Sequence, residues 1–495
     1  MQFQKIQVAA FICIGSLSTL IVHAQNNDSK NYAVQKTISC NKGAVVSAHP
    51  LASMVGLQIL KQGGNAFDAA IATQLTLAVV YPGAGNIGGG GFMVAHLKNG
   101  KNISLDYREK APAKASRDMY LNEKGEPQMN LSQDGHLAAG VPGTVAGLFA
   151  SMKYAKLPFK TLIQPAIDLA EKGFAITASQ ASSLNGTKKE FEALNTVPVA
   201  FVKETEWKAG DILIQKELAN TLKRIRDKGQ KGFYEGETAR LIVAEMQKGK
   251  GLANGQAGII SLADLKTYQA KERDVLDFNY KGYRILTMPL PSSGGIILEQ
   301  MMRMIENKNI VAMGFQTAAS VQLMTEVERR AYADRAEFLG DPDFVKVPVK
   351  TLVSPAYLKE RMKDYEPGKA GNSKNTTAGF IKESEETTHL SVLDALGNAV
   401  SVTTTLNDSY GSKTVVGGAG FLLNNEMDDF SVKPGVPNMY GAIGNKNNAI
   451  APGKRMLSSM TPTIVLKNGS PYLVVGTPGG TTIPTSVFQA LVNVL

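Results

Sequence analysis

The chain has 495 residues, of which 43% are hydrophobic and 19% charged, and this ordinary globular composition excludes a wholly disordered or collagen-like protein. The formal net charge is +10, but the basic residues are dispersed, so we interpret the charge as a source of solubility and expect no nucleic-acid partner. Two cysteines exclude a disulfide scaffold, and the five histidines are too scattered to predict a zinc site, so we expect no metal.

Residues 1–24 predict a signal peptide. Lys5 precedes an apolar run, Val8 to Val22, that is short for a membrane span, and Ala24 ends a Val-His-Ala cleavage site. The alternative is an uncleaved anchor. We favour cleavage, because the Val-His-Ala site places small residues at positions −3 and −1. No later stretch reaches about 18 uncharged apolar residues, so we expect the rest of the chain to be soluble. The expected product is a periplasmic or secreted protein without a stable membrane anchor.

The first part of the mature chain predicts a strand followed by two helices. The strand is residues 43–48, and the apolar periodicity of residues 51–61 predicts a helix. A second helix is predicted for residues 69–80, with Asn65 among the residues that begin it. Cys40, the one cysteine left after cleavage, is interpreted as a small residue near the start of the strand.

A glycine-rich segment, Gly83 to Gly91, follows, and its first six residues match the Gly-x-Gly-x-x-Gly fingerprint of dinucleotide-binding proteins. That mechanism requires a strand before the motif and a helix after it, so that a helix N-terminus meets the pyrophosphate. Here the predicted order is reversed, because a hairpin of residues 92–97 and 102–107 follows. We therefore interpret the segment as a tight turn in which one backbone approaches another.

Residues 140–340 are predicted to be mostly helical, and the clearest pattern is the single apolar face of residues 318–338. Residues 366–386 interrupt this pattern. They are rich in glycine and asparagine and end in acidic residues, which is typical of an exposed loop.

After Glu386 the chain becomes rich in predicted strands. One hairpin is expected for residues 389–394 and 399–405, and a second region of strands for residues 461–467 and 471–476. An amphipathic helix begins near Thr485. The whole pattern mixes helices and antiparallel hairpins, so we expect an α+β fold.

The chemical signal is a threonine, Thr387 or Thr388, between the loop and a buried strand. Threonine is a weak nucleophile unless a base lies beside it. If the chain is cut before this residue, its new α-amine can be that base, because such amines titrate at about pH 7.7 to 8.0. On its own the pattern is weak, since threonine also favours strands.

Many segments in one order make the chain similar to the γ-glutamyltranspeptidases, from about residue 43 to its end. They are Gly63-Gly-Asn-Ala-Phe-Asp-Ala-Ala, Gly85-Asn-Ile-Gly-Gly-Gly-Gly-Phe, Asp106-Tyr-Arg-Glu-Lys-Ala-Pro-Ala, Pro291-Ser-Ser-Gly-Gly, Tyr332-Ala-Asp-Arg, Thr387-Thr-His-Leu-Ser-Val, Gly397-Asn-Ala-Val-Ser-Val-Thr-Thr-Thr-Leu-Asn, Leu423-Asn-Asn-Glu-Met-Asp-Asp-Phe-Ser, Pro434-Gly-Val-Pro-Asn, Arg455-Met-Leu-Ser-Ser-Met-Thr-Pro and Thr477-Pro-Gly-Gly.

The resemblance implies an N-terminal-nucleophile hydrolase fold, a four-layer αββα sandwich, made as a precursor that cuts itself between Glu386 and Thr387. Residues 25–386 would be the large subunit and residues 387–495 the small subunit, and the two would remain a heterodimer. Relatives continue beyond the last Thr-Pro-Gly-Gly segment, so we expect the small subunit to be truncated at its C-terminus.

The resemblance makes Thr387 the nucleophile and its α-amine the general base. Thr405 would hydrogen-bond and orient Thr387. The amides of Gly479 and Gly480 would stabilise the oxyanion of the tetrahedral intermediate, since glycine leaves the approach unobstructed. His389 is expected to support structure or maturation and not to act as the base.

The resemblance also implies a pocket for the α-amino-acid end of the donor. Arg108 would grip the α-carboxylate, for which its planar fork is suited, and Tyr440 would belong to a lid loop. The remaining contacts fall to Ser458 and Ser459 at the carboxylate and to Asn407, Glu426 and Asp429 at the α-ammonium group.

The expected activity is γ-glutamyltransferase and glutathione hydrolase, without a cofactor. Its partners would be glutathione and other γ-glutamyl compounds, with water or an amino-acid or peptide amine as the acceptor. Two alternatives stay open. One is a related acylase that releases glutaryl groups from β-lactams and needs no ammonium pocket. The other is an unprocessed, inactive secreted binding protein, because a truncated chain can leave the site poorly supported.

Overall fold

The computed structural model describes residues 37–252, 255–372 and 387–495. The predicted signal peptide, Glu386 and most of the loop before it lie outside this part. Residues Cys40–Leu495 form one compact unit, to which the following description refers. Within the described ranges, no helix has the length and apolar character needed to cross a membrane.

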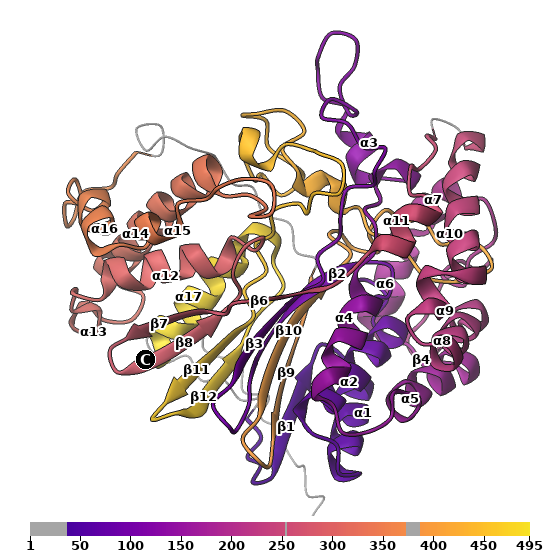
Figure 1. The fold of residues 1–495 in the computed structure, drawn as a ribbon, viewed down its shortest axis with the longest axis horizontal. Coiled ribbons are helices and arrows are strands. Elements are labelled where there is room, and N and C mark those ends of the chain that lie inside the picture. The colour runs from indigo at the N-terminus through magenta and orange to yellow at the C-terminus, as the bar shows by residue number, and fades with distance from the viewer. Residues whose placement is uncertain (1–36, 253–254, 373–386) are drawn as a thin grey trace, which may run out of the picture. The chain divides into compact units, whose positions relative to one another are not determined.

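The larger sheet has six antiparallel strands drawn from both halves of the chain (Figure 1). Their spatial order is β1 (Gly43–Ser47), β9 (Thr388–Asp394), β10 (Ala399–Thr405), β2 (Gly90–His96), β3 (Asn102–Asp106) and β6 (Lys271–Arg273). The two strands that follow Thr387 therefore lie in the interior of the sheet, between strands that precede it. This places the predicted nucleophile at the end of a central strand.

The second sheet has four antiparallel strands. Their order is β12 (Ser470–Val475), β11 (Thr463–Lys467), β8 (Tyr283–Thr287) and β7 (Leu276–Tyr280). The sequence analysis missed β7 and β8 inside the region predicted as mostly helical. The sequence signal for this hairpin was the dipeptide Lys281-Gly282. In the structure both residues have a positive φ, 45° and 84°, as a tight hairpin turn requires.

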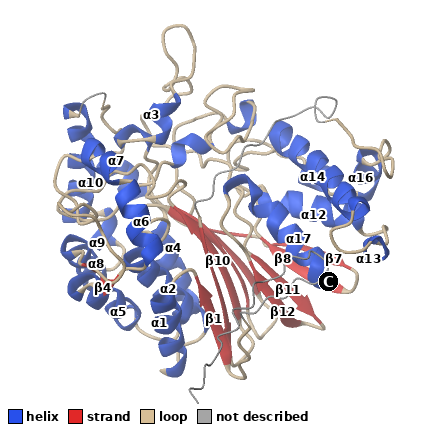
Figure 2. Ribbon diagram, turned by 180° about the vertical axis from the view of Figure 1, so that it is seen from behind, coloured by secondary structure: helices blue, strands red, loops and turns tan. Residues whose placement is uncertain are grey.

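The two sheets face each other and helices cover both outer faces (Figures 1 and 2). Phe92 and Val94 of one sheet pack with Leu286 and Ile464 of the other in one buried cluster. The outer helices of the six-stranded sheet include α1 (Pro50–Lys61), α2 (Ala66–Val80), α4 (Thr144–Ser151) and α5 (Phe159–Lys172), and those of the four-stranded sheet are α12 (Gly294–Ile305), α14 (Ala318–Phe338) and α17 (Ile483–Val494). The four-layer αββα prediction is confirmed.

Shorter elements complete the described part of the chain. A small ribbon pairs β4 (Phe174–Ala175) with β5 (Ile212–Leu213). The remaining α-helices are α3 (Met129–Gln133), α6 (Ala178–Gly186), α7 (Lys188–Leu194), α8 (Lys216–Lys228), α9 (Lys231–Tyr234), α10 (Gly236–Lys248), α11 (Leu262–Thr267), α13 (Ile310–Met313), α15 (Val349–Leu352) and α16 (Pro355–Arg361).

The predicted helix boundaries agree with the structure where a clear signal marked them. The 318–338 helix is α14 with the same bounds. The second predicted helix begins three residues earlier than expected, at Ala66, because Asn65 and Asp68 form a reciprocal capping box. Cys40 is an exposed free thiol shortly before β1.

The glycine-rich segment is a packed turn between α2 and β2, as predicted. A Cβ on Gly85 would lie 2.2 Å from the Leu77 carbonyl oxygen, and one on Gly88 would lie 2.1 Å from the Leu422 carbonyl oxygen. Both distances are far below contact distance, so these positions exclude any larger residue. The turn thereby holds the segment after Leu422 against the start of β2, close to the site described next.

Candidate active site

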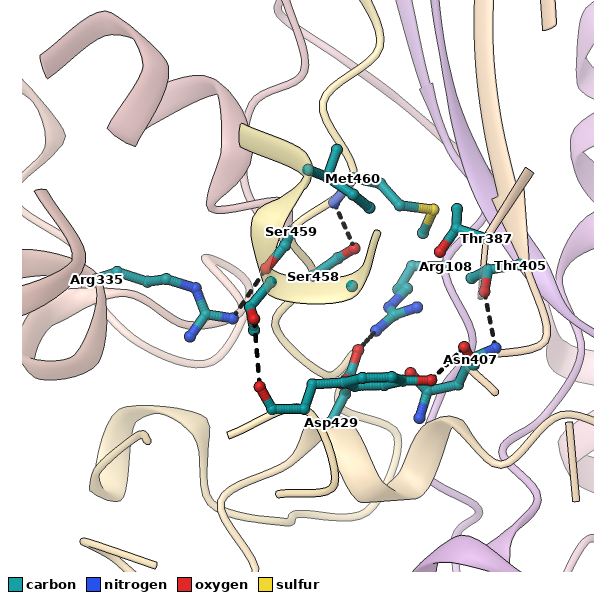
Figure 3. Close-up of a pocket in the computed structure, with 13 residues that line it drawn as sticks. Arg108, Arg335, Thr387, Thr405, Asn407, Asp429, Ser458, Ser459 and Met460 are labelled. Atoms are coloured by element: carbon teal, nitrogen blue, oxygen red, sulfur yellow. Dashed lines mark hydrogen bonds and ion pairs between the residues drawn. The ribbon is translucent and has the colours of Figure 1, made fainter. Parts of the chain in front are cut away.

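A pocket lies at the ends of β9 and β10, beside loops from other parts of the chain (Figure 3). Nine of the residues predicted for the site line it: Arg108, Thr387, Thr405, Asn407, Asp429, Tyr440, Ser458, Ser459 and Gly480. These residues come from segments separated by up to several hundred positions. The fold therefore brings together side chains that the sequence shows only as isolated motifs.

Thr387 and Thr405 face each other because of strand register. β9 and β10 are antiparallel, and Thr404 pairs with Thr388. One further step along both strands places Thr405 opposite Thr387, at the open end of the hairpin. Directly opposed side chains in such a pair have Cβ atoms roughly 5 Å apart. Thr387 is almost completely buried, with 6% of its surface exposed, and Figure 3 shows it beside Thr405.

The chain leaves β10 through a turn that Thr405 and Asn407 stabilise together. The backbone N–H of Asn407 donates a hydrogen bond of 2.8 Å to Thr405 Oγ1, and Asn407 has a φ of 81°. Asparagine tolerates this left-handed conformation better than most residues. Asn407 Nδ2 donates to the Asn425 carbonyl at 3.1 Å, which links this turn to the acidic segment.

The predicted oxyanion residues lie at the start of the segment that leads into α17. Gly479 and Gly480 have φ values of 134° and 50°, which favour glycine, and Gly480 lines the pocket while Gly479 is buried beside it. The Gly479 carbonyl accepts hydrogen bonds from Thr482. In the described part of the chain, neither glycine amide donates a hydrogen bond. Both N–H groups are thus available to a ligand.

Arg108 is a buried cation of the pocket, and carboxylates surround it. Its guanidinium forms ion pairs with Glu426 and Asp429, and its Nη1 lies 3.5 Å from Glu109 Oε2. Its Nε donates to the Met456 carbonyl at 3.3 Å. Glu426 and Asp429 lie in the 3₁₀ helix η4 (Glu426–Asp429), more than 300 positions along the chain from Arg108.

Burial opposes the ionisation of two carboxyl groups near Arg108, Glu109 and Glu426. Burial raises the pKa of Glu109 to about 7, and Arg108 opposes that change only in part. Burial also raises the pKa of Glu426 well above its ordinary value. Asp429 is less enclosed, and Asn438 Nδ2 donates to its Oδ1 at 3.0 Å. Arg108 thus lies among several acidic groups, and burial opposes the ionisation of two of them, Glu109 and Glu426.

Ser458 and Ser459 lie across the pocket from the strands. The Ser458 hydroxyl oxygen accepts a hydrogen bond of 3.1 Å from the Met460 N–H. Ser459 Oγ accepts one of 3.3 Å from Arg335 Nη2, shown in Figure 3. The Ser458 backbone is fixed by Pro291, whose carbonyl accepts its N–H at 2.9 Å.

Tyr440 closes one side of the pocket. It is buried, its hydroxyl donates to the Asn407 carbonyl, and its own carbonyl accepts from Thr481 Oγ1 at 3.2 Å. It therefore connects the turn after β10 to the glycine segment. This arrangement suits the predicted lid loop, whose movement stays a prediction.

His389 lies on β9 but is not among the residues that line the pocket. Its ring nitrogens hydrogen-bond Thr403 Oγ1 and Ser391 Oγ, both at 3.0 Å. Burial lowers the pKa of the ring to about 3, so the imidazole is neutral at physiological pH. A structural part in the sheet fits these contacts.

Sequence reasoning assigned no role to Arg335, Thr481 or Met460, which also line the pocket. Arg335 belongs to the Tyr332-Ala-Asp-Arg segment of α14, and Tyr332 on the same helix face donates a hydrogen bond to the Thr481 carbonyl. The sequence signal was the three-residue spacing of Tyr332 and Arg335, which places both side chains on one helix face. Its target, however, is a loop almost 150 residues away, which no local pattern reveals.

Comparison with known proteins gives consistent results. The family model for gamma-glutamyltranspeptidase matches residues 52–495. A "Glutathione hydrolase proenzyme" from Pseudomonas aeruginosa is 49% identical over 462 residues, which cover 91% of this chain and 79% of that protein. The crystal structure of Helicobacter pylori gamma-glutamyltranspeptidase is 44% identical, with a TM-score of 0.65 over 68% of this chain and 96% of that one. A cephalosporin acylase from Bacillus halodurans is 26% identical, with a TM-score of 0.80 over 95% of this chain and 83% of that one.

Proposed function

The chain belongs to the γ-glutamyltranspeptidase family, and we propose that it transfers the γ-glutamyl group of glutathione to water or to an amine, with Thr387 as the nucleophile. The observation that carries this proposal is the convergence of nine expected residues on one pocket. Its chemistry matches an amino-acid donor, because it offers a hydroxyl nucleophile, a guanidinium for a carboxylate and acidic groups for an ammonium.

Maturation would begin at the peptide bond between Glu386 and Thr387. Thr387 Oγ1 attacks the Glu386 carbonyl, the C–N bond breaks and an ester forms. Water then hydrolyses the ester, which releases the Glu386 carboxylate and regenerates the hydroxyl. The reaction leaves Thr387 with a free α-amine, the base that an N-terminal threonine needs.

In the mature enzyme the α-amine accepts the Thr387 hydroxyl proton while Oγ1 attacks the γ-carbonyl carbon. The negative charge that develops on the carbonyl oxygen would be stabilised by the free amides of Gly479 and Gly480. The C–N bond then breaks, and cysteinylglycine leaves with the proton on its nitrogen. Water or an acceptor amine resolves the acyl-enzyme by the reverse sequence.

Donor binding would exchange ion pairs. Without substrate, the Arg108 guanidinium is paired with Glu426 and Asp429. A bound γ-glutamyl group brings its own carboxylate to Arg108 and its own ammonium group to Glu426, Asp429 and Asn407. Each charged group of the donor then faces a group of opposite charge, so the pocket favours a zwitterion over either ion alone.

The wider setting follows from the predicted leader. A cleaved signal peptide would deliver the precursor to the periplasm or the exterior, where extracellular glutathione and γ-glutamyl compounds are the donors. The two processed pieces, residues 25–386 and 387–495, would act as one heterodimer.

The test uses purified protein after incubation, with intact mass, N-terminal sequencing and release of p-nitroaniline from γ-glutamyl-p-nitroanilide. We expect two pieces, the smaller beginning Thr387-Thr388-His389, and turnover of the donor. Thr387→Ala should remain uncut and inactive. Thr388→Ala is the matched control and should mature, because no side chain or backbone group described by the structure hydrogen-bonds its hydroxyl.

The alternatives predict other results. Faster release from glutaryl-p-nitroanilide than from the γ-glutamyl compound would favour an acylase. A single uncut chain in all three proteins would reject the proposal and favour an inactive binding protein.

A further inference from the structure

We infer that Arg335, on α14, is a positioning residue that makes the pocket select donors with a free α-carboxylate, by fixing the Ser459 hydroxyl as a hydrogen-bond donor. The inference rests on the proposed function, whose donor binds in this pocket. It gives a role to the Tyr332-Ala-Asp-Arg segment, which contributes no reacting group.

Arg335 is held rigidly at the wall of the pocket. Its side chain is buried, with 7% of the residue exposed, and it lines the pocket together with Ser458 and Ser459. Its Nε donates to Ser293 Oγ at 3.0 Å and its Nη2 to Ser459 Oγ at 3.3 Å. Ser293 Oγ in turn donates to the Ser458 carbonyl at 2.6 Å. The guanidinium is thus anchored to the loop that it orients.

The contact with Arg335 determines the hydrogen-bonding role of the Ser459 hydroxyl. A guanidinium can only donate, so the Ser459 oxygen must be the acceptor and its own proton remains available. The same holds for Ser458, whose oxygen accepts from the Met460 N–H. Neither hydroxyl donates a hydrogen bond to any residue that the structure describes. The pocket therefore presents two O–H donors side by side, which matches the two oxygens of a carboxylate.

The positive charge of Arg335 also favours the binding of a carboxylate in the pocket. Among the described residues, no carboxylate forms an ion pair with it, whereas Arg108 is paired with Glu426 and Asp429. Burial lowers the pKa of the Arg335 guanidinium. The nearby Tyr332 and Asp429 raise it and the charge of Arg108 lowers it, but arginine stays protonated in proteins. An anion that enters the pocket relieves the repulsion between these two cations.

Three anilide donors separate this role from general support of the fold. γ-Glutamyl-p-nitroanilide has both α-groups, glutaryl-p-nitroanilide retains only the carboxylate, and 4-aminobutanoyl-p-nitroanilide retains only the amine. For Arg335→Met we expect kcat/KM to fall about 30-fold or more on the first two donors, mainly through KM, and less than about threefold on the third. Arg335→Lys, which keeps the charge but loses the fork, should show a smaller loss with the same selectivity.

The matched control is Arg303→Met on neighbouring α12, where the arginine pairs with Glu299 away from the pocket. It should leave all three donors unchanged. Arg335→Met and Ser459→Ala should be non-additive on the γ-glutamyl donor, because the first acts through the second. An equal loss on all three donors, additive effects, or full activity of Arg335→Lys would overturn the inference.

Equilibrium binding separates this inference from the proposed function. Calorimetry on the native protein and on Arg335→Met should show that the substitution weakens binding of L-glutamate and leaves binding of 4-aminobutanamide, which has no carboxylate, unchanged. If the native protein turns over no donor, the proposed function fails, while the binding measurement still decides the role of Arg335. Equal weakening of both ligands, or of neither, rejects that role.

Discussion

At the residue scale, the site concentrates charge where water is scarce. Arg108 and its carboxylates are buried, and an isolated ion there would be costly. The structure solves this by pairing Arg108 with Glu426 and Asp429 and by leaving Glu109 with a pKa raised to about 7. A group held neutral by burial makes stability depend on pH.

The expected pH dependence follows from proton counting. Because the pKa of Glu109 is raised from 4.5 to about 7 in the folded state, the native protein binds more protons than the unfolded chain between these values. The free energy of unfolding therefore falls as the pH rises from about 5 to 8. Urea denaturation at several pH values should show this fall, and it should be smaller in Glu109→Gln.

Glu360→Gln is the control for that measurement, since Glu360 is an exposed surface residue on α16. Its pH profile should follow the native protein. If Glu109→Gln also keeps the native slope, the proton held near Arg108 is not on Glu109 and must be assigned to Glu426.

At the element scale, α14 joins the loops of the predicted site in the later chain to the helical layer. Tyr332 and Arg335 lie three positions apart and so on one face of the helix. Tyr332 bonds the Thr481 carbonyl, next to the glycines, and Arg335 bonds Ser459. One helix face therefore sets the distance between the predicted oxyanion site and the carboxylate site.

Removal of the Tyr332 hydroxyl should loosen the glycine segment. For Tyr332→Phe we expect kcat on γ-glutamyl-p-nitroanilide to fall about tenfold with little change in KM, because the oxyanion forms only in the transition state. Steady-state kinetics measure the effect. Tyr357→Phe is the control: its hydroxyl bonds Asp334, in the same motif but away from the pocket, and its loss should lower stability and spare kcat.

Local patterns predicted what local physics determines. Capping at Asn65 and the apolar face of α14 marked helices, and the hairpin of β9 and β10 followed from alternation. The pairing of Thr405 with Thr387 was implied by the family resemblance, and the register of this hairpin in the structure is consistent with it. The β7–β8 hairpin was missed because its strands are short and lie between helical segments.

At the scale of the whole molecule, long-range partners were predictable only through the family resemblance. Arg108 and Asp429 are 321 positions apart, and nothing in either local sequence indicates that they meet. The family resemblance did not predict the role of Arg335. The motif was visible, but its contact with Ser459 depends on how α14 packs against the loops before β11, which only the tertiary structure reveals.

The topology also predicts how the processed protein behaves. Cleavage before Thr387 would leave β9 and β10 in one piece and their neighbours β1 and β2 in the other, and the second sheet is divided in the same way between β11 and β8. The contact between the pieces is thus the interior of both sheets and the apolar layer between them. Such a surface resembles a domain core cut in half, so exposing it to water costs as much as unfolding.

We therefore expect the processed pieces to elute together in size-exclusion chromatography under native conditions, over a wide range of dilution. They should separate only in denaturant concentrations that also abolish circular dichroism, because separation and unfolding are one event. The uncut Thr387→Ala chain is the control and should elute at the same volume. Pieces that separate on dilution while each keeps its secondary structure would contradict a shared core and would indicate two independent domains.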